Sequence, residues 1–152
     1  AVEMALAADQ VTQAMPLMAA LSATAKQRPE LMLAASVAAR SGQRASAGEA
    51  AQNLQVWVAE DPADAGAWQQ LATLYAAQGQ TLRAIRAEAE TQVARLDYAA
   101  GVDRLRAAQD LVRQGNVNGS GRVDHIEASI IDTRKREVEL RLKEQTLDKE
   151  IN

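Results

Sequence analysis

The chain contains no cysteine, no phenylalanine and only one histidine in 152 residues. Without cysteine there can be no disulfide, no thiolate metal ligand and no thiol catalysis, although any cellular compartment remains compatible. Two tryptophans and two tyrosines are the only aromatic residues, and β-branched residues are sparse and scattered, so we do not expect strands. There is no apolar run long enough to span a bilayer and no recognisable signal peptide.

The chain also lacks an excess of charge of one sign. Lys and Arg number 17, Asp and Glu number 20, and the two signs are interspersed, which leaves a net charge of −3. Because no basic stripe could neutralise phosphates, we do not expect nucleic acid as a partner. The longest basic run, Arg134 to Arg136, is flanked by acidic residues, a pattern typical of a solvated helix face.

Alanine is the abundant residue, with 33 copies. Alanine has the highest helix propensity and allows helices to approach closely, so this composition favours an all-α fold of packed helices. Apolar periodicity and breakers indicate helices over residues 1–25, interrupted at Pro16, and then over 29–41, 46–59, 65–78, 81–95, 98–114 and 124–148. Since the first residues already follow a helical pattern, we expect the chain to be a piece of a longer protein.

Helix starts and stops are predicted from capping residues. The pairs Ser46/Glu49 and Asp124/Glu127 have the spacing of a capping box, and Asp64 and Thr81 are candidate N-caps. Gly42 stands where a C-terminal cap belongs. Three glycines among residues 115–121 indicate a connecting loop before the last helix.

One stretch has the residue pattern of a helical repeat. Trp68, Leu71 and Tyr75 fall on one face of a helix, small alanines stand where two helices would cross, and a glycine stands where a short turn needs a positive φ. This pattern resembles the tetratricopeptide repeat, W-x-x-L-(G/A)-x-x-Y followed by Gly and Ala. The repeat-defining residues are Trp68, Leu71, Ala72, Tyr75, Gly79 and Ala84.

The pattern departs from the regular repeat in three ways. Glu88 stands where the repeat has an aromatic residue, and Leu96 where it has a proline. The turn signature also recurs after 17 residues, half a repeat, so residues 81–95 should close one unit and open the next. With a degenerate match upstream, we expect two to three irregular repeats of antiparallel helix pairs in a right-handed superhelix. The expected organisation is a linker or eroded repeat (1–28), repeats (29–114), a Gly-rich loop (115–121) and a long C-terminal capping helix (122–152).

A more particular resemblance rests on runs within residues 61–71, 79–90, 100–106 and 125–134. Together they resemble the C-terminal tetratricopeptide-repeat domain of bacterial periplasmic Ste24-like zinc metalloproteases, relatives of the protease that assists outer-membrane β-barrel assembly. The resemblance covers roughly residues 29–142. It implies a periplasmic location and an upstream zinc endopeptidase domain outside this chain. That family's His-Glu-x-x-His motif is absent here, because His125, expected in the first turn of the last helix, is the only histidine.

The leading functional hypothesis is a non-catalytic protein-interaction module without a cofactor of its own. Stacked helix pairs form a concave surface, which could hold an extended peptide, a substrate or components of the outer-membrane assembly machinery. The sequence offers no Ser/His/Asp set and no phosphate-binding glycine loop, so an independent enzyme is not expected. The repeat frame predicts that the concave surface carries Ser36, Arg40, Gln69, Thr73, Arg83, Arg86 and Glu90.

An alternative hypothesis gives the C-terminal helix an assembly or autoinhibitory role. This amphipathic helix could fill the module's own groove, pack on the protease domain or pair with a second copy. Its apolar spacing does not hold a strict heptad over three or more turns of seven, which disfavours a long coiled coil. Mass in solution discriminates between this hypothesis and the first.

Overall fold

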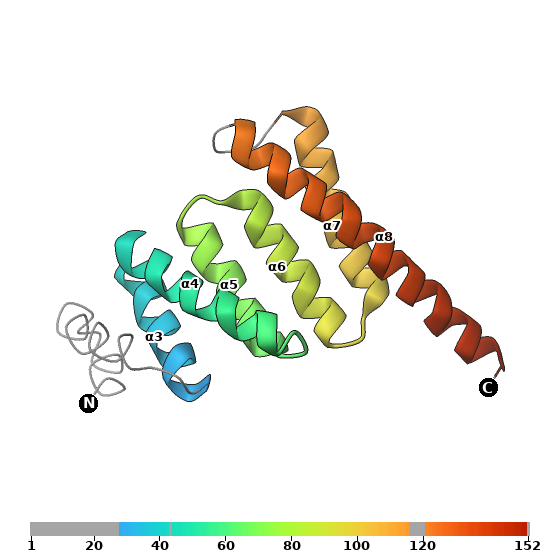
Figure 1. Cartoon of the computed structure of the whole chain (residues 1–152), viewed down its shortest axis with the longest axis horizontal. Coiled ribbons are helices and arrows are strands. Elements are labelled where there is room, and N and C mark those ends of the chain that lie inside the picture. Colours follow the sequence, from blue (N-terminus) through green and yellow to red (C-terminus); the bar gives the residue numbers. More distant parts are fainter. Residues whose placement is uncertain (1–27, 43, 116–120, 152) are drawn as a thin grey trace.

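The computed structural model describes residues 28–42, 44–115 and 121–151 (Figure 1). All the regular structure in these ranges is helical, which confirms the all-α class. The helices predicted over residues 1–25 and most of the Gly-rich loop lie outside the described residues. The six described helices are α3 (Arg28–Ser41), α4 (Arg44–Glu60), α5 (Ala65–Ala77), α6 (Thr81–Ala94), α7 (Tyr98–Gln114) and α8 (Gly121–Ile151).

The residues predicted to cap the starts of three helices do not occupy their N-cap positions. Ser46 is the third residue of α4 and Asp124 the fourth of α8, so neither precedes its helix as a capping box requires. The spacing misled because a capping-box pair is also an ordinary i, i+3 pair inside a helix. Thr81 is the first residue of α6, whose N-cap is Gln80.

Asp64 is the predicted N-cap that the structure confirms, and it connects the ends of three helices. Its Oδ1 accepts from the backbone N–H of Ala67 at 3.1 Å, and its Oδ2 accepts from Trp57 Nε1 of α4 at 2.9 Å. Arg28, the first residue of α3, donates to both carboxylate oxygens, at 2.6 and 3.1 Å. The hydrogen bond from Arg28 lowers the pKa of Asp64 to about 2, and those from Trp57 and Ala67 lower it further against the opposing effect of burial.

The turns that follow α5 and α6 have the same backbone geometry. After α5, Gln80 N–H donates to Tyr75 O at 2.9 Å, while Gly79 has φ +74° and donates to Ala76 O. After α6, Asp97 donates to Gln92 O at 2.9 Å, while Leu96 has φ +66° and donates to Val93 O. Both are Schellman motifs, with the left-handed position filled once by glycine and once by leucine. This confirms the equivalent corners inferred from the 17-residue spacing.

Each helix packs on the next one along the chain, but contacts between second neighbours are selective. α3 packs on α5, and α6 packs on α8. Within the described ranges, α5 and α7 do not pack on each other, although a uniform stack of pairs would bring them together as it does α3 and α5. The described part of the chain is therefore two three-helix units, α3–α4–α5 and α6–α7–α8, joined through the α5–α6 pair (Figure 1).

The hydrophobic core is divided in the same way, and α6 contributes to both parts. Ala84 and Ala87 of α6 belong to the cluster formed with α3, α4 and α5. Leu82, Ala89 and Val93 belong to the cluster formed with α7 and α8. Because these two sets fall on different faces of one helix, α6 contributes one face to each cluster.

The repeat-defining residues lie in or beside the first cluster. Trp68, Leu71, Ala72, Tyr75 and Ala84 are all buried. Trp68 Nε1 donates to Pro62 O at 3.0 Å, and the guanidinium of Arg83 lies 6.0 Å from the centre of the Tyr75 ring. Gly79 has the positive φ that its turn requires.

Candidate functional site

The seven residues predicted for a concave surface lie on three helices and in two packing environments. Four are on helices that pack on each other, Ser36 and Arg40 on α3 and Gln69 and Thr73 on α5. The other three, Arg83, Arg86 and Glu90, are on α6, on which α8 packs. The seven therefore fall into two groups according to the helices that carry them.

The α3–α5 group is the more open of the two. Arg40, Gln69 and Thr73 are exposed, and Ser36 is half-buried. The hydroxyls bond within their own helices, Ser36 Oγ to Met32 O at 3.1 Å and Thr73 Oγ1 to Gln69 O at 3.2 Å. This group presents side chains of short reach plus one arginine, without a buried charge.

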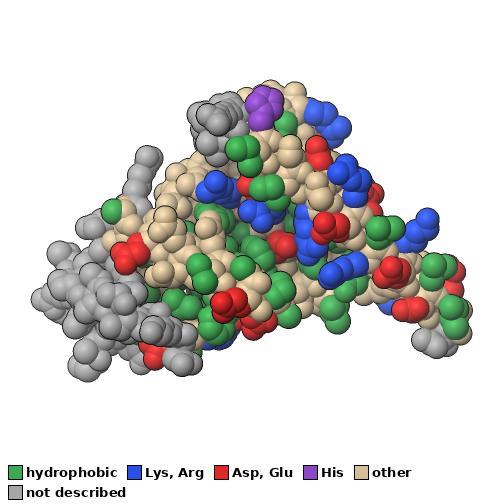
Figure 2. Space-filling model, in the orientation of Figure 1, with side chains coloured by type: hydrophobic (Ala, Val, Ile, Leu, Met, Phe, Trp, Pro, Cys, Tyr) green, Lys and Arg blue, Asp and Glu red, His purple; other side chains and the backbone are tan. Residues whose placement is uncertain are grey.

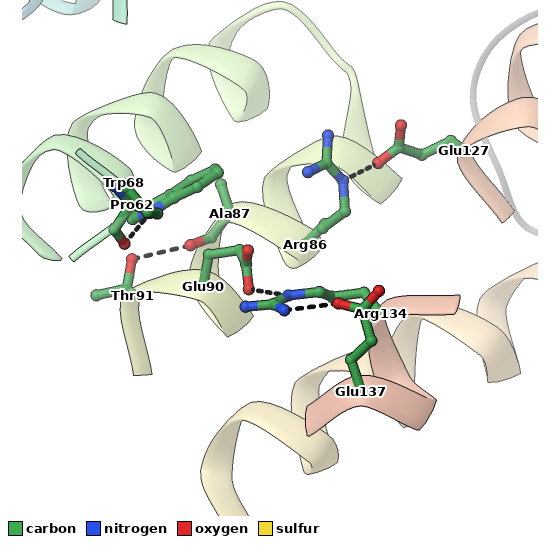
Figure 3. Close-up of polar contacts among 9 residues, drawn as sticks. All are labelled: Pro62, Trp68, Arg86, Ala87, Glu90, Thr91, Glu127, Arg134 and Glu137. Atoms are coloured by element: carbon green, nitrogen blue, oxygen red, sulfur yellow. Dashed lines mark hydrogen bonds and ion pairs between the residues drawn. The ribbon is translucent and has the colours of Figure 1, made fainter. Parts of the chain in front are cut away.

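The α6 group is covered by α8 through ion pairs (Figure 3). Arg86 Nε donates to Oε1 of Glu127, and Arg83 Nε lies 3.8 Å from Oε2 of the same carboxylate. Glu127 is only 4% exposed, although it sits on the surface helix α8. Its carboxylate is thus held between two guanidiniums of α6.

A second ion pair of opposite polarity lies two turns along α8. Arg134 Nε donates to Glu90 Oε1 at 2.8 Å, and its Nη1 donates to Glu137 Oε2 at 2.9 Å (Figure 3). Burial acts to lower the pKa of Arg134, but the bonds and charges of Glu90 and Glu137 outweigh it, and the pKa is raised. Glu90 itself is 9% exposed.

These five residues form one polar seam between two helices. On α8, Glu127 and Arg134 share the buried stripe with Ile131 and Val138, which are fully buried. On α6, Arg86 and Glu90 lie one turn apart, so that Arg86 faces Glu127 and Glu90 faces Arg134. The seam, defined as Arg83, Arg86, Glu90, Glu127 and Arg134, allows α8 one register on α6, because a shift of one turn would separate every pair.

The α8 side of this seam was not predicted from the sequence. Glu127 was expected to cap the last helix and Arg134 to lie on a solvated face, and the structure contradicts both expectations. A signal was present: carboxylate and guanidinium stand seven residues apart on the stripe of Ile131 and Val138, so both share its buried face. The prediction for Arg134 was wrong because it lies in a run of charged residues, and such runs are usually solvated.

The described residues show no arrangement for metal chemistry. Within residues 28–42, 44–115 and 121–151, no three His, Asp or Glu side chains gather closely enough to hold a metal ion. His125, the fifth residue of α8, is exposed. A single imidazole cannot supply the two-histidine set of a zinc endopeptidase, which the family resemblance places in a domain outside this chain. In the same ranges, no helix is both long and apolar enough to cross a membrane.

Comparison of the chain with protein-family models, curated proteins and solved structures gives no match.

Proposed function

We propose that this chain is a non-catalytic, tetratricopeptide-like interaction module that docks substrate or assembly-machinery proteins for an upstream zinc metalloprotease domain, or regulates that domain. The proposal includes the right-handed superhelical repeat and the periplasmic location implied by the family resemblance. Its support is the agreement between the repeat pattern and the burial of the residues that define it, Trp68, Leu71 and Tyr75 above all. Stacked helix pairs characteristically bind other protein segments along one face.

The accessible docking surface in this proposal is the α3–α5 group. Arg40, Gln69 and Thr73 are exposed there, whereas Arg86 and Glu90 on α6 are engaged by α8. An incoming segment on α6 would have to break buried ion pairs, whereas one on α3 and α5 would displace mainly water. Small polar side chains and one arginine suit an extended peptide bound through its backbone and acidic side chains.

The test is capture of binding proteins from a Gram-negative envelope extract. Wild-type chain is compared with the variant Arg40→Glu/Gln69→Glu, which reverses the charge of the α3–α5 group. The matched control, Arg106→Glu/Gln114→Glu, makes the same two chemical changes at exposed positions of α7. Circular dichroism verifies that all three proteins are equally helical.

We expect wild type and control to capture outer-membrane or assembly proteins and the α3–α5 variant to lose at least most of that capture. Equal capture by all three proteins would reject the α3–α5 surface. Capture by none of them, together with binding to a separately purified protease domain, would favour the regulatory branch of the proposal.

A further inference from the structure

The long helix α8 has a second stripe of side chains that no described residue covers. Eight residues follow one another at spacings of 4, 3, 4, 3, 4, 3 and 4 along the helix, and all eight are exposed. Five of them are apolar, with Ile126 59%, Leu140 63% and Ile151 81% exposed. This outer stripe consists of Ile126, Ile130, Thr133, Glu137, Leu140, Glu144, Leu147 and Ile151.

The spacing of the outer stripe is that of a two-stranded coiled coil. The heptad spacing is not evident from the apolar residues, because Thr133, Glu137 and Glu144 stand between them. All eight residues are exposed, so together they form one continuous stripe. It is separate from the inner stripe of Glu127, Ile131 and Val138, which packs on α6 and α7. From Ile126 to Ile151 it extends about 38 Å at the rise of an α-helix.

The shape of the molecule leaves this stripe accessible. α8 has 31 residues, and its C-terminal part projects past the other helices (Figure 1). The space-filling view shows hydrophobic side chains along α8 and at its projecting end (Figure 2). Single exposed apolar residues are ordinary, but five in heptad register on a projecting helix are the mark of a helix–helix interface.

We propose that a second copy of this chain covers the outer stripe, with the two α8 helices antiparallel. In the register centred between Glu137 and Leu140, Ile126 meets Ile151 of the second copy and Ile130 meets Leu147 of the second copy. Each end of the interface then pairs apolar residues with apolar residues. The two ends of the stripe are thus complementary to each other.

The two arrangements differ in which residues the carboxylates of the stripe face directly. A parallel pair would place Glu137 on Glu137 of the second copy and Glu144 on Glu144 of the second copy, and each contact would cost free energy. In the antiparallel register these carboxylates lie opposite Leu140 and Thr133 instead.

The surface beside Ile130 has a shape that suits this contact. A depression of about 320 Å³ is lined by Ser129, Ile130, Thr133, Arg134 and Glu137. Residues at i, i+3, i+4 and i+7 of one helix form the hole that receives a side chain in knobs-into-holes packing. Residues 130, 133, 134 and 137 have that spacing, and all four line the depression.

The first test is mass in solution by sedimentation equilibrium of the full chain, up to millimolar concentration. We expect a dimer for wild type and a monomer at the same concentrations for Leu147→Glu/Ile151→Glu, whose changes lie on the projecting end. The control Val56→Glu makes the same kind of change at a residue of α4 that is also exposed, and it should remain dimeric. A wild-type monomer at every concentration, or a dimer unaffected by the double variant, overturns the proposal.

The second test fixes the direction by cysteine crosslinking, for which the cysteine-free chain is suited. An equimolar mixture of Ile130→Cys and Leu147→Cys proteins should form the mixed disulfide under mild oxidation at least ten times faster than either protein crosslinks with itself. Faster self-crosslinking of Ile130→Cys indicates a parallel pair and overturns the antiparallel assignment. Crosslinking at the same rate when both proteins also carry Ile126→Glu/Ile151→Glu would show random collision and overturns the interface.

Discussion

The two three-helix units share a packing scheme but are fastened by polar groups of different kinds. In α3–α4–α5 the charged group is Asp64, which sits at a helix end and receives bonds from Arg28, Trp57 and the α5 backbone. In α6–α7–α8 the charged groups face each other along the sides of helices, as Arg86 with Glu127 and Glu90 with Arg134. The contact at a helix end uses backbone N–H groups that have no partner within their own helix. The contacts along the helix sides instead bury charges, and each buried charge is stabilised mainly by its partner.

The largest effect should come from removing one partner of the seam. Glu127→Ala leaves the guanidiniums of Arg86 and Arg83 against α8 without their carboxylate, and we expect about 3 kcal/mol less stability by urea unfolding. The double variant Arg86→Ala/Glu127→Ala should cost less than the two single changes added together, because neither charge is then left alone. The matched control is Glu88→Ala, which removes the exposed pair of Glu88 with Arg104 at 3.6 Å and should cost less than about 1 kcal/mol. Equal losses in Glu127→Ala and Glu88→Ala would contradict the importance of burial.

The seam also decides how the α8 helix should be tested. Deleting everything after Gly121 would strip Ile131 and Val138 from the second core, since both are fully buried. A loss of dimer on truncation would then be indistinguishable from unfolding. Point changes on the outer stripe avoid this, because Leu147 and Ile151 are exposed.

The comparison also shows what the sequence could and could not predict. Helix positions were predictable from alanine content, period and breakers, and Asp64 was recognisable because an N-cap bonds within three residues of itself. The environment of Glu127 was not, because its partners are 41 and 44 residues away on another helix. A local sequence pattern predicts bonds between residues close together in the chain. The packing of α8 on α6 is a tertiary contact, and the sequence of α8 by itself does not predict it.

The predicted interaction face illustrates the same limit. The regular repeat frame treats every unit alike, and it put Arg83 and Arg86 on the same surface as Gln69. The second-neighbour contact moves from α3–α5 to α6–α8, so α6 has a covering helix that a uniform stack would not give it.

A smaller effect is expected at the helix-end fastening, and it depends on pH. The pKa of Asp64 is about 2 in the folded chain, below its value of about 3.9 in an unfolded one, so folding favours the ionised form. Its stabilisation is complete above about pH 5 and is lost as the pH falls towards 2, amounting to about 2 kcal/mol once solvent screening of the exposed Arg28 is allowed for. Urea unfolding from pH 6 to pH 2.5 measures it, with Asp64→Asn as the control that keeps a capping oxygen without a titratable group. If both proteins lose stability in parallel over this range, Asp64 is not the group responsible.

The smallest effects should come from the two Schellman turns, which differ mainly in the residue at the left-handed position. Leu96 has φ +66° and a 63% exposed side chain, so Leu96→Gly removes strain and little packing, and we expect about 1 kcal/mol more stability. Gly79→Ala should have the opposite sign and a similar size, about 1 kcal/mol, because an added Cβ at Gly79 meets no atom within 4 Å and the cost is one of backbone conformation alone. Thermal unfolding of both variants provides the measurement.

Since Gln145 Nε2 donates to Leu96 O at 2.9 Å, the α6–α7 turn is also held by α8. A gain from Leu96→Gly would therefore mean that the second unit keeps a strained turn that the first unit avoids, and a loss would mean that the leucine side chain contributes contacts that outweigh its strain.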